Sequence, residues 1–284
     1  MLIIHQYTTG PHPCPYLAGQ TAEFQYSVAP FLSADEYEEL MDGRCRKFGL
    51  ALFRPVCKAC AMCRPIRFAA AEFAPDRSQR RALRRNADLE VRVGAPSCDA
   101  QRLELYRRYH RVQRELKAWP QQADGQAEYE FSFVHNQLPS TELSVWEKGV
   151  LRGVLITENT PNVVSAVYHY YEPECSERGL GTFLIMQCAR LAECLQRRWV
   201  YLGYYIAGCR SMEYKAKFQP CEVLGVDGVW KRHDEEAWRA GISKCATDLA
   251  QCGAHPLTPR ASTPVGPLPE GEGNCVARVS NRTV

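Results

Sequence analysis

Three cysteines at CxxCxxC spacing constrain this chain more than any other feature of its sequence. Cys57, Cys60 and Cys63 stand close together, and Cys14 precedes them in a Pro-Cys-Pro-Tyr-Leu segment. Thiolates spaced in this way can converge on one soft metal centre. The run resembles a ferredoxin pattern more than the paired CxxC of a zinc ribbon. We therefore predict a four-thiolate set that holds an iron–sulfur cluster or zinc, with a metal-free set as the third alternative.

An arginine-rich segment follows the cysteines. Five arginines occupy residues 77–85, which contain no lysine and no carboxylate. They are Arg77, Arg80, Arg81, Arg84 and Arg85. Asp76 is a predicted helix N-cap, and Arg80 and Arg84 then lie one turn apart on one face. Guanidinium groups bind phosphates well, so we predict that this helix binds RNA or an acidic substrate. The alternative is a solvated helix face paired with acidic neighbours.

The composition is that of an ordinary globular protein. The chain has 284 residues, 45% of them hydrophobic and 24% charged, with a formal net charge of +3. A charge this small does not favour a protein that coats nucleic acid, so any contact with RNA should be local. We read no signal peptide and no apolar stretch of the roughly 20 residues that cross a bilayer. Fourteen cysteines then indicate a reducing cytoplasm and no membrane partner.

We expect an α+β protein with three parts. Residues 1–92 form an N-terminal module that contains the cysteine cluster, a short helix at 34–42, a strand at 67–73 and the arginine helix. Residues 97–240 form a second domain. Residues 254–284 contain five prolines and few large apolar side chains, so we expect a disordered tail.

The pattern of the second domain predicts a helix, an antiparallel meander, a glycine-led helix and a further strand. The expected ranges are 98–118 for the first helix, 142–146, 150–157 and 163–171 for the meander, 179–198 for the second helix and 199–205 for the last strand. This order is that of an acetyltransferase-like (GNAT-type) mixed sheet with helices. In that fold a strand splays before the glycine-led helix, whose N-terminus cradles pyrophosphate. Ser176 departs from the usual pyrophosphate loop, which argues against coenzyme A as the donor.

Several dispersed motifs, taken in order, resemble those of the aminoacyl-tRNA–protein transferases. They are Cys14-Pro15-Tyr16-Leu17, Phe53-Arg54-Pro55-x-Cys57-x-x-Cys60-x-x-Cys63, the arginine segment, Tyr170-Tyr171-Glu172-Pro173, Tyr201-Leu202-Gly203-Tyr204-Tyr205 and Met212-x-Tyr214-Lys215-Ala216-Lys217-Phe218. The resemblance covers roughly residues 13–235. It implies transfer of an amino acid from its tRNA to proteins that begin with Asp or Glu, which marks them for degradation by the N-degron pathway. The short chain resembles the bacterial type, in which leucine is the usual donor residue.

The chemistry of such a transfer suggests roles for particular residues. The ester of an aminoacyl-tRNA is already activated, so forming the amide needs no metal or cofactor. We expect Glu172 or Tyr204 to carry the proton, although the resemblance leads us to expect Asp rather than Glu before the proline. We expect Arg178, Lys215 and Lys217 to bind the acidic acceptor, and the arginine helix to bind tRNA. The oligomeric state cannot be read from the sequence.

Three alternatives stay open at this point. Arginine rather than leucine could be the transferred residue, in which case the side-chain pocket should contain a buried carboxylate. An N-acetyltransferase that uses acetyl-coenzyme A would share the second domain. A non-catalytic, metal-dependent RNA-binding protein would explain the cysteines and arginines but would leave the second domain without a task.

Overall fold

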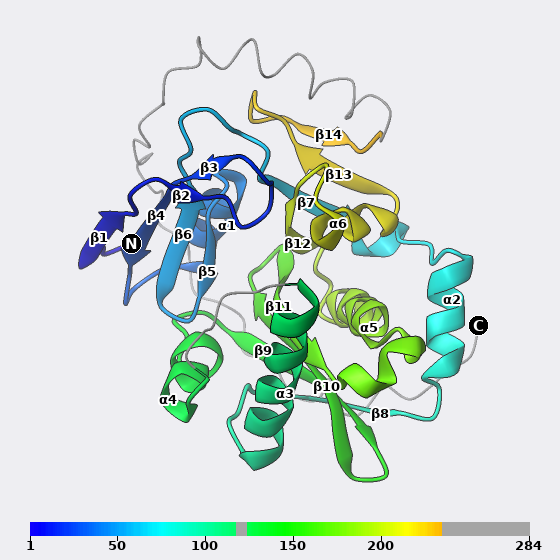
Figure 1. The fold of residues 1–284 in the computed structure, drawn as a ribbon. Helices are drawn as coiled ribbons and strands as arrows, with labels where there is room; N and C mark the ends of the chain where they lie inside the picture. Colours follow the sequence, from blue (N-terminus) through cyan, green and yellow to red (C-terminus); the bar gives the residue numbers. More distant parts are fainter. Residues whose placement is uncertain (118–123, 235–284) are drawn as a thin grey trace, which may run out of the picture.

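The chain is organised around one large mixed sheet, as Figure 1 shows. The computed structural model describes residues 1–117 and 124–234. Eight strands lie in the order β14-β13-β7-β12-β11-β10-β9-β8, and only β11 and β12 run parallel. Their bounds are β7 (Arg64–Ala69), β8 (Glu90–Gly94), β9 (Ser140–Glu147), β10 (Val150–Asn159), β11 (Val163–Tyr171), β12 (Trp199–Tyr205), β13 (Cys221–Leu224) and β14 (Trp230–Arg232). The predicted α+β class is therefore confirmed, with a mixed sheet and helices.

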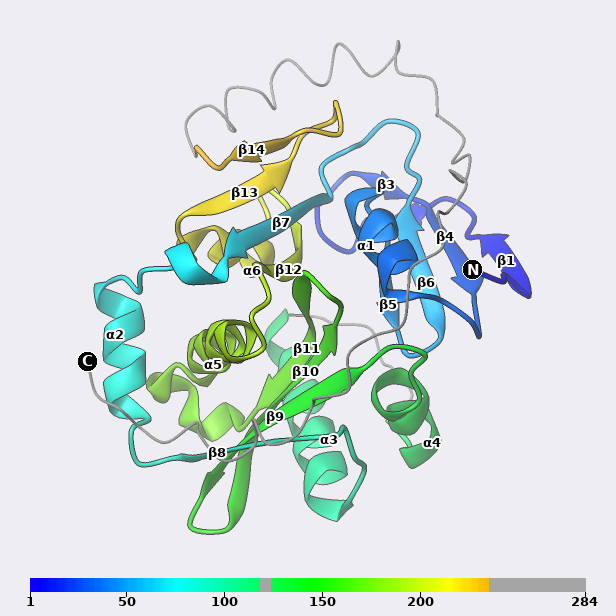
Figure 2. The same ribbon diagram turned by 180° about the vertical axis from the view of Figure 1, so that it is seen from behind.

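Helices cover both faces of this sheet because its central strands are apolar on both sides. Leu155 of β10 belongs to one buried cluster, and its neighbours Val154 and Ile156 belong to another. Successive side chains of a strand point to opposite faces. The first face packs against α2 (Arg77–Arg85), α5 (Leu180–Cys194) and the short helix η1 (Ala70–Glu72). The second face packs against α3 (Ala100–Lys117), α4 (Gln126–Tyr129) and η2 (Glu130–Val134), and Figure 2 shows the same layers from behind.

The predicted meander is confirmed. Strands β9, β10 and β11 pair antiparallel in sequence order. The turn between the first two uses Lys148 and Gly149, whose φ angles of 50° and 81° match the left-handed turn that suits a two-residue hairpin. The expected helix at 179–198 was too long, because α5 ends at Cys194 and Gln196 adopts a positive φ of 55°. The strand at 199–205 is β12.

A second, four-stranded sheet occupies the N-terminal part, in the order β1-β4-β6-β5. Its strands are β1 (His5–Thr8), β4 (Phe24–Val28), β5 (Arg46–Phe48) and β6 (Ala51–Pro55). None of these strands is predicted from the sequence, whereas the helix α1 (Ala34–Asp42), which packs on them, is. A hairpin of β2 (His12–Pro13) and β3 (Thr21–Ala22) completes the part. The strand predicted at 67–73 lies earlier, as β7 at Arg64–Ala69.

Strands from both sides of the expected boundary near residue 92 lie in the large sheet. β7 sits between β13 and β12, and β8 forms one edge beside β9. The remaining elements are short: η3 (Pro173–Arg178), α6 (Arg210–Glu213) and η4 (Tyr214–Lys217). The expected disordered tail at 254–284 lies outside the described residues. Across the described ranges, no helix is both long and apolar enough to cross a membrane.

A buried ion pair joins the two sheets. Lys47 of β5 donates to Glu158 of β10, and the two side chains are 0% and 1% exposed. The Lys47 Nζ also donates to Asn136 Oδ1 at 2.6 Å and to the Gly49 carbonyl at 2.9 Å. Burial lowers the pKa of Lys47, and the Glu158 carboxylate opposes that shift. Removing either partner would therefore leave the other side chain buried without its counter-charge.

Breaking this pair from one side should be costly. We expect Glu158→Leu to lower the free energy of unfolding by about 3–5 kcal/mol, because it leaves the Lys47 ammonium buried and unpaired. The double variant Lys47→Met with Glu158→Leu should lose clearly less. Urea unfolding followed by circular dichroism measures both. Lys231→Met is the matched control, since it removes an exposed pair with Asp227 and should cost less than about 1 kcal/mol. Equal losses for the single and double variants would contradict the coupling.

Candidate functional site

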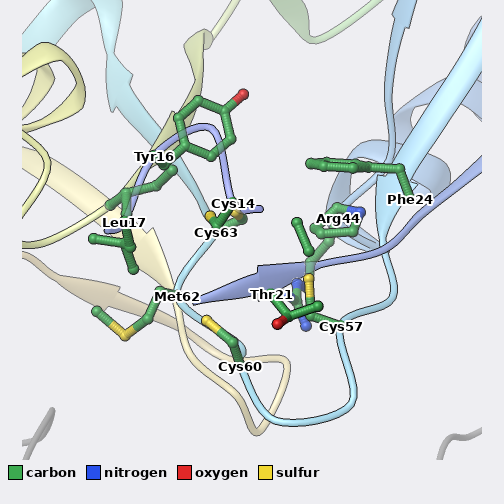
Figure 3. Close-up of a pocket in the computed structure, with 13 residues that line it drawn as sticks. Cys14, Tyr16, Leu17, Thr21, Phe24, Arg44, Cys57, Cys60, Met62 and Cys63 are labelled. Carbon is green, nitrogen blue, oxygen red and sulfur yellow. The ribbon is translucent and has the colours of Figure 1, made fainter. Parts of the chain in front are cut away.

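The four cysteines of the predicted thiolate set line one cavity, which Figure 3 shows in close-up. Cys14 comes from the loop between β2 and β3, and the other three come from the loop between β6 and β7. The cavity has a volume of about 10 Å³, which is roughly the room for one water molecule. Its wall also includes Tyr16, Phe24 and Arg44. The fold therefore brings two distant stretches of sequence to one small space.

Burial dominates the electrostatics of this cavity. It raises the pKa of the Cys63 thiol to about 12, and the nearby Arg44 guanidinium opposes the shift. Burial also raises the pKa of Cys60 and of Tyr16. Cys57 Sγ accepts a hydrogen bond from the Glu23 amide at 3.4 Å. None of the described cysteines forms a disulfide.

Four thiols around one space are the donor set that zinc or an iron–sulfur cluster takes. In the described part of the chain, however, no group of three or more His, Cys, Asp or Glu side chains is arranged to hold a metal ion. The set thus has the chemistry that a soft metal takes, but its side chains are not arranged as a ligand shell.

Two residues of this region were missed from sequence. Arg44 enters the cavity from the turn after α1, where it adopts a φ of 66°. Cys209 packs against Cys63, Tyr204 and Ile206 in a small buried cluster. Arginine and cysteine carry no spacing signal at these positions, so only the tertiary structure could reveal them.

Strands β11 and β12 diverge beside this cavity. Their parallel pairing joins Val163 with Trp199, Val164 with Val200 and Ser165 with Tyr201, and it is recorded for no later residue. β11 nevertheless continues to Tyr171 and β12 to Tyr205. We call the parts of these two strands that no longer pair with each other the splayed segment; each still pairs with its other neighbour, β10 or β7. Backbone groups that leave a ladder need other partners.

Cations supply those partners at the end of β12. Lys215 Nζ donates to the Tyr204 carbonyl at 2.8 Å, and Arg46 Nη2 lies 3.4 Å from the Gly203 carbonyl. Lys215 is only 8% exposed, and burial together with the nearby Arg46 lowers its pKa to about 7. Lys217, by contrast, is exposed at the end of η4. The two lysines predicted to bind the acceptor are thus separated, one inside and one on the surface.

The two candidates for proton transfer have different surroundings. Glu172 follows β11 directly and is 3% exposed. Its Oε2 accepts from Arg108 Nη2 at 2.7 Å, while Oε1 has no hydrogen-bond partner among the described residues. Tyr204 is also buried, but its hydroxyl donates to the Arg44 carbonyl at 2.7 Å. Burial raises the pKa of that hydroxyl.

The glycine-led helix starts beside Glu172. Gly179 has a φ of 69°, a left-handed conformation that glycine adopts without strain. A Cβ at Gly181 would lie 3.0 Å from the Tyr171 ring, so a larger residue here would require that ring to shift. No side chain caps the first turn of α5. Amide groups at the N-terminus of a helix can bind an anion such as a phosphate.

Arg178 is engaged in holding the structure together. Its guanidinium donates to Glu147 Oε1 at 2.8 Å, to Asn86 Oδ1 at 3.0 Å and to the Arg85 carbonyl at 2.8 Å, and it also pairs with Asp88. These contacts fasten the end of α2 to the segment before α5. The predicted role of Arg178 in binding the acceptor stays untested, but its hydrogen-bonding capacity is largely used here.

The arginine helix has the predicted shape. Asp76 caps α2 in a capping box with Gln79, and Gln79 and Ala82 form its buried face. The five predicted arginines are exposed, and no ion pair engages them within residues 1–117 and 124–234. Two of them donate to backbone carbonyls: Arg85 to that of Glu177 at 2.6 Å and Arg80 to that of Pro75. Figures 1 and 2 place α2 and the four-stranded sheet on opposite sides of the molecule.

Comparison with known proteins identifies relatives that match most of the chain. Residues 12–81 match the family model described as arginine-tRNA-protein transferase, N terminus, and residues 101–225 match the model of its C terminus. A protein of Chromobacterium violaceum named aspartate/glutamate leucyltransferase is 33% identical over 82% of this chain and 95% of its own length. Its namesake in Pseudomonas putida strain GB-1 is 36% identical over 77% and 92%.

Solved structures resemble the chain only loosely. One is the C-terminal domain of a putative lysylphosphatidylglycerol synthetase of Agrobacterium fabrum, with a TM-score of 0.39 and 15% identity over 69% of this chain and 67% of that one. A TM-score this low does not assign the chain to a fold or a function. The family models and the relatives together show the family: the chain belongs to the aminoacyl-tRNA–protein transferases, whose members include the aspartate/glutamate leucyltransferases.

Proposed function

We propose that this enzyme transfers leucine from Leu-tRNA to proteins that begin with Asp or Glu, and so marks them for degradation. The relatives that match most of the chain carry the name aspartate/glutamate leucyltransferase. The reaction joins an activated ester to an amine, with the tRNA 3′ hydroxyl as the leaving group. Because charged tRNA is its substrate, we place the protein in the cytoplasm. Arginine as the donor residue is the runner-up.

The single observation that carries this proposal is the divergence of β11 and β12 next to the uncapped start of α5. Acetyltransferase-like enzymes use this combination to bring an acyl donor beside an acceptor amine. We infer that residues 97–240 act as such a GNAT-type domain, with an aminoacyl ester in place of the thioester. Holding two reactants in register can lower a barrier by roughly 7–11 kcal/mol, so positioning is the main task of this site.

Glu172 is the better placed of the two candidates for proton transfer. An N-terminal α-amine has a pKa near ~8, so the acceptor arrives partly as an ammonium that must lose a proton. The Glu172 Oε1 lacks a partner, and Arg108 fixes the other oxygen. Tyr204 would first have to release the Arg44 carbonyl. We therefore assign proton acceptance to Glu172 and a positioning role at the end of β12 to Tyr204.

Recognition of both substrates rests on cations. The exposed arginines of α2 suit the phosphates of tRNA. Lys217 is the exposed candidate for the acidic side chain of the acceptor, whereas Lys215 is buried against the Tyr204 carbonyl and Arg178 is paired with Glu147.

The thiol cavity is proposed to hold an iron–sulfur cluster or zinc once its four cysteines are deprotonated. A soft metal would offset the cost of ionising buried thiols, which Arg44 alone only moderates. When bound, such a centre would supply structural or regulatory support. The amide-forming step itself needs no metal, because the ester is already activated.

The direct test is incubation of the full chain with a peptide that begins with Asp or Glu and with Leu-tRNA, Arg-tRNA or acetyl-coenzyme A. We expect mass spectrometry to find one added leucine at the peptide N-terminus with Leu-tRNA alone. A peptide that begins with Gln is the control and should stay unmodified. An added arginine would establish the runner-up, and an acetyl group would refute both.

Glu172→Gln keeps the shape of the side chain but removes its basicity. We expect kcat/KM to fall by about 100-fold, which is at the lower end for a lost general base. The loss should shrink at higher pH, where more of the acceptor amine is already neutral. Glu174→Gln alters an exposed neighbour and should leave kcat/KM within about twofold. Equal activity of both variants across pH would exclude Glu172 from proton transfer.

Charge reversal on α2 tests tRNA binding. We expect Arg80→Glu with Arg84→Glu to raise the KM for Leu-tRNA and to flatten the plot of log Kd against log salt by about one unit per lost phosphate contact. The KM for the peptide should not change. Arg232→Glu, on the exposed β14, is the matched control. An unchanged KM for Leu-tRNA would remove α2 from the tRNA-binding surface.

Metal content can be measured on protein purified without oxygen. We expect iron with sulfide, or zinc, at a near-stoichiometric level, and its loss in Cys60→Ser. Cys194→Ser changes an exposed cysteine outside the cavity and should keep the metal. Trace metal in all three proteins would show that the thiols act without one.

A further inference from the structure

A row of aromatic rings crosses the four-stranded sheet from its edge toward the splayed segment. Tyr7 of β1 lies directly opposite Tyr26 of β4, which lies opposite Phe53 of β6. The ring centroids are 5.3 Å and 6.0 Å apart, and the planes differ by only 14° and 29°. Phe48 of β5 continues the row, 5.5 Å from Phe53 and tilted by 12°. We call these four residues the aromatic row.

The aromatic row lies on the face of this sheet that is turned away from α1. On the other face, Leu52 packs with Tyr37 and Met41 of α1 in a buried cluster. Neighbouring residues on a strand point to opposite faces, so Phe53 points away from that helix. Accordingly, α1 lies behind the sheet in Figure 1 and in front of it in Figure 2. Tyr7 is 49% exposed, and the other three rings are half-buried.

The inner end of the row reaches the proposed transfer site. Phe53 meets Tyr204 edge to face at 6.5 Å, and Phe48 meets Tyr168 in the same way at 6.1 Å. Tyr204 and Tyr168 belong to the two strands of the splayed segment. The row therefore leads from an exposed sheet edge to the place where the acyl group would react.

No carboxylate on this face of the sheet would repel an anionic partner. The strand positions on this face include His5 and Arg46 and contain no Asp or Glu. Arg46 is the cross-strand partner of Phe53. Aromatic rings on the face of a sheet can stack the bases of a single-stranded nucleic acid.

We propose that Tyr7, the outermost ring of the aromatic row, stacks an unpaired 3′-terminal nucleotide of the aminoacyl-tRNA, and that the row leads from there toward Tyr204. This inference rests on the proposed function, and it assigns the single-stranded end of the RNA to a surface of its own. The row and α2 lie on opposite sides of the molecule. The row would therefore take the single strand and leave paired RNA to other cations, with α2 among them.

Binding of uncharged RNA to the full chain tests the row without requiring any transfer. The probes are two labelled hairpins with the acceptor-stem sequence, one with a four-nucleotide 3′ tail and one blunt. We expect Tyr7→Ala to weaken binding of the tailed hairpin by at least about fivefold and to leave the blunt hairpin unchanged, because one base loses its stacking partner. Tyr7→Trp should restore tight binding of the tailed hairpin.

Phe31→Ala is the matched control. Phe31 is 70% exposed and follows β4 instead of lying in the row, so its loss should change neither Kd. The proposal is overturned if Tyr7→Ala leaves the tailed hairpin unaffected, if it weakens both hairpins equally, or if it raises only the KM for the peptide. A chain that binds the tailed hairpin through Tyr7 but transfers no leucine would refute the proposed function and keep this inference.

Discussion

The ion pair between Lys47 and Glu158 fixes how the two sheets meet, and most of the site depends on that placement. Neither charge can separate from the other without standing alone in the interior. The pair holds β5 against β10, and through β5 it holds the aromatic row beside the splayed segment. The N-terminal sheet is therefore part of the site and not an appended module.

Strand β12 is the element that the different parts of the site share. Its first residues pair with β11, whereas its end leaves that strand and relies on Lys215 and Arg46 for its carbonyl partners. Tyr204 at this end also packs with Cys63 and Cys209 beside the thiol cavity. A structural change in the cavity would therefore affect β12, the strand that lines the proposed transfer site.

The arginines divide into two groups with different tasks. Arg178 donates hydrogen bonds to Glu147, to Asn86 and to the Arg85 carbonyl at the end of α2, and it thereby anchors that helix. Because α2 is anchored in this way and capped at Asp76, its exposed arginines sit on a rigid support. Fixed cations lose less entropy on binding phosphate than cations on a mobile segment.

The sequence by itself determined the parts whose signals are local. The capped arginine helix, the β9–β11 meander and β12 follow from periodicity, turn residues and caps, and the dispersed motifs identified the family. Short strands such as β1 and β4 carry no comparable signal. Only the tertiary structure decided that the four cysteines share a cavity with Arg44, that Lys215 is buried while Lys217 is exposed, and that Tyr7, Tyr26 and Phe53 align. Each of these depends on contacts between residues far apart in the chain, which local pattern does not encode.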